Sequence, residues 1–103
     1  MNSLHLAAQA SAARLARFRR KRLQQVAAML QQPDPCIDDV LFGMSSSMGL
    51  AFHIRSMVPI LTPHQWQEFD AELRRQDAAF QQATEAVVFP SHFSHAVSLA
   101  AHS

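Results

Sequence analysis

The sequence predicts an all-α fold, a small helical bundle of three long or four shorter helices that forms a single domain over residues 1–103. The chain holds only two glycines, and its abundant Ala, Gln, Leu, Arg and Glu favour helix, whereas β-branched residues are sparse. Prolines at 33–35, at 59–63 and at 90 divide the chain into segments. We therefore expect helices at about 4–31, 35–58, 63–88 and 91–101.

The first expected helix, at about 4–31, is amphipathic. At about 100° per residue, one arc contains the apolar residues Leu4, Ala8, Leu15, Phe18, Leu23, Val26, Met29 and Leu30. Four cations lie on the opposite side: Arg14, Arg17, Arg20 and Lys21. Arg19 and Arg22 fall inside the apolar arc. We expect these two either to extend past the edge of the core or to mark a part of the helix that projects beyond the bundle.

The second expected helix, at about 35–58, begins with several favourable signals. The Asp-Pro dipeptide at 34–35 suggests a capping Asp followed by Pro at the first helical position. Asp38 and Asp39 suit the positive end of the helix dipole. Two glycines that enclose a run of serines weaken the middle of this helix, so we expect a break or kink at 43–49.

The third expected helix, at about 63–88, has the clearest start. Thr62, Pro63 and Gln65 match a capping box with Pro at the first position. Large apolar residues then recur at heptad spacing, which predicts a seam that packs inside the bundle or against a second copy of the chain in a homodimer. If one edge of the seam is exposed, it forms an apolar interface for a partner, built from Trp66, Phe69, Leu73 and Phe80.

The charge is distributed unevenly along the chain. Six of the nine basic residues lie within 14–22, and no Asp or Glu occurs before Asp34. The formal net charge of +1 therefore combines a strongly basic segment with an acidic remainder. Arginine forks suit phosphates and carboxylates. We expect an anionic macromolecule, either an acidic protein surface or nucleic acid, to bind Arg14, Arg17, Arg19, Arg20, Lys21 and Arg22.

The basic segment has other interpretations. It can be a solvated face, or a surface that lies on a membrane. An acid-free, Arg-rich amphipathic N-terminus also fits a mitochondrial transit peptide. In a further alternative, the acidic residues of the third helix neutralise it within the bundle: Glu68, Asp70, Glu72 and Asp77.

Residue patterns for catalysis or metal binding are not recognisable, so we expect no enzyme activity, no cofactor and no metal. The serine run at 45–47 lacks the Gly-x-Ser-x-Gly elbow of a nucleophile. His92, His95 and His102 lie on roughly one face of the last expected helix, but no carboxylate accompanies them in sequence. A Gly-Met-Ser turn at 43–45 is only a degenerate match to a helix-turn-helix.

The composition also indicates where in the cell the protein is expected and which class of function it has. Cys36 is the only cysteine, and no apolar run approaches the ~20 residues of a membrane span, so we expect a cytoplasmic protein. The sequence therefore predicts a non-enzymatic, small regulatory or adaptor protein that binds a macromolecular partner. The alternative is a DNA-binding regulator that uses the same basic helix.

Overall fold

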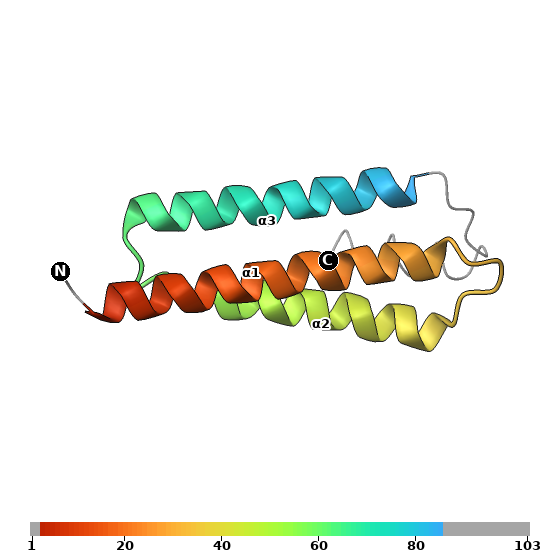
Figure 1. Ribbon diagram of the computed structural model, residues 1–103, viewed down its shortest axis with the longest axis horizontal. Coiled ribbons are helices and arrows are strands. Elements are labelled where there is room, and N and C mark those ends of the chain that lie inside the picture. Colours follow the sequence, from red (N-terminus) through yellow and green to blue (C-terminus); the bar gives the residue numbers. More distant parts are fainter. Residues whose placement is uncertain (1–2, 86–103) are drawn as a thin grey trace.

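The computed structural model describes residues 3–85, and within them three α-helices follow one another without a strand. Helix α1 spans Ser3–Leu30, α2 spans Ile37–Arg55 and α3 spans Pro63–Thr84. Helix α1 lies in the middle, with α2 on one side and α3 on the other, and the backbones of α2 and α3 come close to each other at few points (Figure 1). The predicted all-α bundle is thereby confirmed. The helix expected at 91–101, with its three histidines, lies outside the described residues.

Helix α1 buries a stripe that is narrow in its first half and bulkier in its second. Ala8, Ala12 and Ala16 are buried in the first half, and Leu23 and Val26 are among those buried in the second. Small side chains at the start let the neighbouring helices approach α1 closely. The buried stripe is rotated relative to the apolar arc that the sequence indicates, because Ala16 and Ala27, beyond one edge of that arc, are buried as well. Phe18, which the sequence places in this arc, is therefore 57% exposed.

Helix α2 is continuous, so the break expected at 43–49 is wrong. Gly43 is buried where α2 crosses α1, and a Cβ atom there would lie 2.4 Å from Val26 Cγ2. The Oγ of Ser47 donates to the carbonyl of Gly43 at 2.9 Å, a bond to the preceding turn of the same helix. The small residues in the middle of α2 thus permit close helix packing, and tertiary contact outweighs their low helix propensity.

The start of α2 also differs from the expectation. The helix begins at Ile37, and Cys36 occupies the capping position without a side-chain hydrogen bond. The Asp-Pro dipeptide at 34–35 lies in the preceding connection, so Asp34 does not cap the helix. Asp38 and Asp39 do lie in the first turn of α2, where their carboxylates favour the positive end of the helix dipole.

The capping box at the start of α3 is confirmed. The amide of Gln65 donates to Thr62 Oγ1 at 3.2 Å, and the amide of Thr62 donates to Gln65 Oε1 at 3.1 Å. The Nε2 of Gln65 also donates to Gln9 Oε1 at 3.0 Å, so the same side chain fixes the beginning of α3 to α1. His5 Nδ1 contacts the carbonyl of Ile60, which holds the α2–α3 connection against the start of α1.

Two apolar clusters form the core, one on each side of a buried polar layer. Each helix contributes one side chain to that layer, Arg19, Ser47 and Gln76. The seam of α3 points inward: Leu73 is 1% exposed, Trp66 and Phe69 pack against the first cluster, and Phe80 packs against the second. The first cluster contains Ala12, Ala16, Ala51, Ile54 and Leu73. The second contains Val26, Leu30 and Val40.

Candidate partner-binding site

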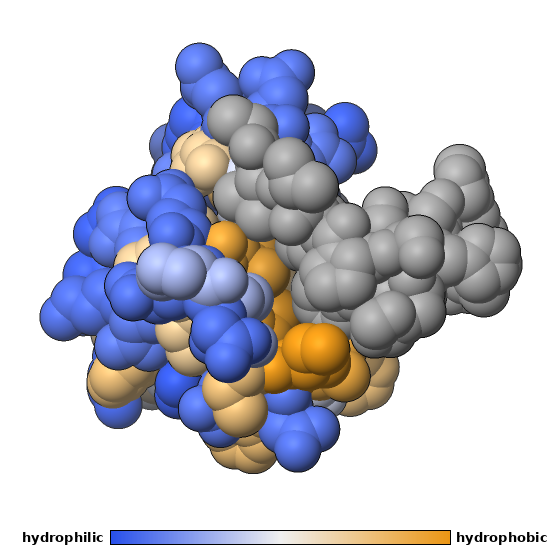
Figure 2. Space-filling model, turned by 90° about the vertical axis from the view of Figure 1, so that its right-hand side faces the viewer, coloured by the Kyte–Doolittle hydropathy of each residue, from blue (hydrophilic) through white to orange (hydrophobic). Residues whose placement is uncertain are grey.

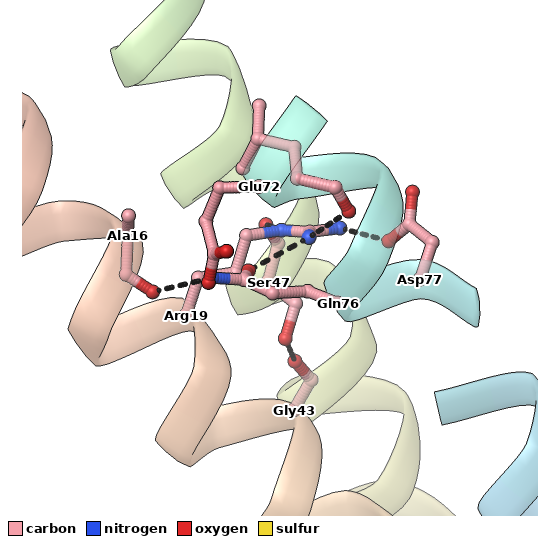
Figure 3. A network of polar contacts seen from close by, with 8 residues as sticks. Ala16, Arg19, Gly43, Ser47, Glu72, Gln76 and Asp77 are labelled. Atoms are coloured by element: carbon pink, nitrogen blue, oxygen red, sulfur yellow. Dashed lines mark hydrogen bonds and ion pairs between the residues drawn. The ribbon is translucent and has the colours of Figure 1, made fainter. Parts of the chain in front are cut away.

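Arg19 lies at the centre of the polar layer and is 6% exposed (Figure 3). Its Nε donates to the carbonyl of Ser47 at 3.0 Å, and its Nη1 donates to Gln76 Oε1 at 3.1 Å. Its Nη2 donates to Asp77 Oδ1 at 2.7 Å in an ion pair. The guanidinium of Arg19 therefore joins all three helices, and its donors are used inside the molecule.

The remaining groups of the layer are satisfied as well. Gln76 Nε2 donates to the carbonyl of Ala16 at 2.9 Å and to Glu72 Oε1 at 3.1 Å. Across residues 3–85, no buried side-chain nitrogen or oxygen lacks a hydrogen-bond partner. A fully satisfied polar layer fixes which parts of the helices lie opposite each other, because any slip would leave buried polar groups unpaired.

The structure places the six predicted site residues in different environments, from buried to exposed. Arg19 is removed from the surface, and a carboxylate of α3, that of Asp77, neutralises it there. Arg20 is exposed, and its Nη1 lies 3.9 Å from Glu72 Oε1. Arg22 is half-buried and donates to Gln25 Oε1 at 3.4 Å.

Arg14, Arg17 and Lys21 are exposed on the outer side of α1, and we call these three residues the basic face. In the part of the chain that the structure describes, none of them takes part in an ion pair. They lie three and four residues apart, so their side chains are neighbours along one side of the helix. The basic face therefore carries positive charge that the described residues leave uncompensated.

A groove of about 440 Å³ lies between α1 and α3 beside the basic face. To its lining, helix α1 contributes Arg20, three residues after Arg17, and Gln24, three residues after Lys21, so both are neighbours of the basic face. Glu72 and Arg75 of α3 supply the other charged groups, and Arg75 Nη2 lies 2.9 Å from Glu72 Oε2. The rest of the lining is mostly apolar and mostly small: Leu23, Ala27, Gln76, Ala79, Phe80 and Ala83.

Glu72 is the charged centre of the groove. Partial burial acts to raise the pKa of its carboxyl, but hydrogen bonds from Gln76 and Arg75 and the charges of Arg75 and Arg20 outweigh this. The pKa of Glu72 is therefore held below its ordinary value, and the carboxylate stays ionised at neutral pH. Two arginines thus share one carboxylate, which leaves the rim of the groove with an excess of positive charge.

The sequence prediction named Glu72 only among the acidic residues that neutralise the basic segment in one alternative, and it did not include Arg75 or the two alanines of α3 as site residues. Glu72, Arg75, Ala79 and Ala83 recur at helical spacing on the flank of the apolar seam. This spacing indicates a shared side of α3, but not which helix lies against it. The apolar seam of α3 packs inside the bundle, which is one of the two arrangements that the sequence predicts, since Leu73 is buried in the core.

The described residues form neither a recognisable metal site nor a helix that could span a membrane. Residues 3–85 contain no group of three or more His, Cys, Asp or Glu side chains arranged to hold a metal ion. The three helices are also too short or too polar to cross a bilayer within this range. Comparisons of the chain with protein-family models, with curated proteins and with solved structures find no match.

Proposed function

We propose that this protein is a non-enzymatic regulatory or adaptor protein that binds an acidic segment of another protein along the basic face and the adjoining groove. The observation that carries the proposal is a set of exposed cations that form no ion pair within residues 3–85, Arg14, Arg17 and Lys21. The contrast with Arg19 supports it, since Asp77 pairs with that inward cation, whereas no carboxylate of the described residues pairs with the three outward ones.

The groove favours a protein partner over nucleic acid. Cations suffice for phosphate binding, whereas the lining of this groove also includes apolar side chains near Arg20, among them the partly buried Phe80 and the exposed Ala79 and Ala83. An amphipathic helix fits both features, because its apolar side chains enter a groove while carboxylates on its flank meet arginines and lysines. The small side chains of Ala79 and Ala83 leave room for a helix to approach.

A capture experiment with a matched charge control tests the proposal. Arg17→Glu reverses one charge of the basic face, and Arg74→Glu reverses one exposed charge of α3 outside the groove. We expect Arg17→Glu to weaken binding of captured acidic partners by at least about tenfold, equivalent to about 1.4 kcal/mol, and Arg74→Glu to leave it unchanged. Circular dichroism checks that both variants remain folded.

Random-sequence duplex DNA provides the second arm. Under the proposal, DNA binds weakly if at all at physiological salt, and the Arg17→Glu effect appears with protein partners. Tight DNA binding with a steep dependence on salt would instead assign the basic face to nucleic acid. Recovery of the same protein partners by wild type, Arg17→Glu and Arg74→Glu would also contradict the proposal.

A further inference from the structure

Helix α2 exposes an apolar surface that the other described helices do not cover. Val40, Ala51 and Ile54 face the core, while the opposite side of the helix carries Phe42, Met48 and Phe52 at 69%, 66% and 71% exposure. Figure 2, which views the molecule from the end where α2 begins, shows apolar residues at the surface of that end. A helix that is apolar on both sides normally lies between two neighbours.

The exposed residues form a defined surface, which we call the outer α2 face. Leu41, Ser45, Met48 and Phe52 follow one another at the spacing of a single helical stripe. Phe42 and Gly49 flank this stripe on one side. A Cβ atom at Gly49 would meet nothing within 4 Å, so the centre of the face is open. Ser45 and Gly49 leave space in the middle of the face, into which a large side chain of another helix can pack.

The stripe is complementary to itself when two copies run antiparallel. A two-fold axis opposite the middle of α2 places Leu41 of one copy across from Phe52 of the other. The same operation places Ser45 across from Met48, a small residue against a large one. Each contact occurs twice, as in an isologous interface. The pattern therefore fits a second α2 running in the opposite direction.

The charges at the two ends of α2 fit the same arrangement. Asp38 and Asp39 lie in the first turn and Arg55 lies in the last turn, all three exposed. Among the described residues, none of them forms an ion pair. In the antiparallel pair, Asp38 of each copy lies across from Arg55 of the other, which supplies opposite charges at both ends of the apolar stripe. The positive N-terminal end of each α2 dipole also lies beside the negative C-terminal end of the other copy's α2.

We infer that the outer α2 face is the contact surface between two copies of this chain. This homodimer uses α2, not the seam of α3, which is inside the bundle. It also leaves the basic face and the groove of each copy uncovered, because those lie on α1 and α3. The inference therefore goes beyond the proposed function and does not depend on it.

Sedimentation equilibrium of the full chain over a concentration series tests the inference. We expect a monomer–dimer equilibrium that Phe52→Glu weakens at least about thirtyfold, as for an apolar contact at the centre of an interface. Leu6→Glu is the matched control, since Leu6 is an exposed apolar residue of α1 outside the face, and it is expected to leave dimerisation unchanged. Circular dichroism confirms that each variant is folded.

A charge exchange identifies the antiparallel geometry. Asp38→Arg or Arg55→Asp alone places like charges opposite each other and weakens the dimer, whereas the double variant restores the attraction. The two positions are about 25 Å apart along one helix, so rescue can only arise between copies. A monomer at every concentration would overturn the inference and leave the face to another occupant, residues 86–103 of the chain among them. A dimer that is insensitive to Phe52→Glu, or a double variant no better than the singles, would overturn it equally.

Discussion

Replacing Arg19 by Ala is expected to destabilise the protein far more than replacing any outward cation of α1. The methylene stem of Arg19 is buried, and its loss costs about 2 kcal/mol at roughly 0.8 kcal/mol per methylene. Gln76 Oε1 then loses its donor inside the core, which adds about 1 kcal/mol. Asp77 is half exposed and returns to water, so it adds little. We therefore expect a loss of about 3 kcal/mol in the free energy of unfolding.

Urea unfolding followed by circular dichroism measures this difference. Arg17→Ala is the matched control on the same helix, because Arg17 is exposed and forms no ion pair with the described residues; its change is expected to stay within about 0.5 kcal/mol. Arg19→Met keeps most of the stem volume, so its loss is expected to fall to about 1 kcal/mol. Equal losses for Arg19→Ala and Arg17→Ala would refute the reasoning that divides inward from outward cations.

Three further predictions concern the fold, and urea unfolding checks each of them. Gly43→Ala is expected to cost about 1–3 kcal/mol because the new methyl group meets Val26, whereas Gly49→Ala, in open space, is expected to stabilise α2 by up to about 1 kcal/mol; equal effects would contradict the close approach of α2 to α1. Thr62→Ala removes one half of the capping box and is expected to cost about 1 kcal/mol, and an unchanged midpoint would argue against the cap. The pKa of Glu72 is lowered in the folded protein, so its ionised form stabilises the protein at neutral pH, and this contribution is lost as the pH falls below 4.5 and through the folded pKa. Glu72→Gln is therefore expected to reduce the acid-side slope of the free energy of unfolding against pH. An unchanged slope would contradict the lowered pKa.

The three helices within residues 3–85 follow in order from the sequence because the breaks and the helix formers act locally. Thr62 and Gln65 form the capping box at the predicted place, since both partners lie within one turn. The cap of α2 is different. Asp34 has the right chemistry, but the chain enters the helix only at Ile37, and the choice among nearby starts depends on how the connection leaves α1.

The candidate site could be predicted only in part. Helical projection placed Arg19 and Arg22 in the same apolar arc, yet the structure buries the first and leaves the second at the edge. Their difference depends on Asp77 and Gln76, which are more than fifty residues away in the chain. Periodicity within one helix gives the direction of a side chain, but not the group that lies opposite it.

The same limit applies to α2. Its residues are apolar on several sides, so periodicity alone does not show which side meets the core. Gly43, expected to weaken the helix, instead marks the point at which α2 meets Val26 of α1. The outer α2 face can be identified only once it is known which side of α2 packs against the core.

Site-specific photo-crosslinking from the groove tests the central claim most directly. A photoreactive residue at Gln24, which lines the groove next to the basic face, reports what lies there in the full chain. The account predicts crosslinks to an acidic, amphipathic segment of a protein partner, lost in Arg17→Glu and kept in Arg74→Glu. Crosslinks to nucleic acid, or the same protein crosslinks in all three backgrounds, would contradict it.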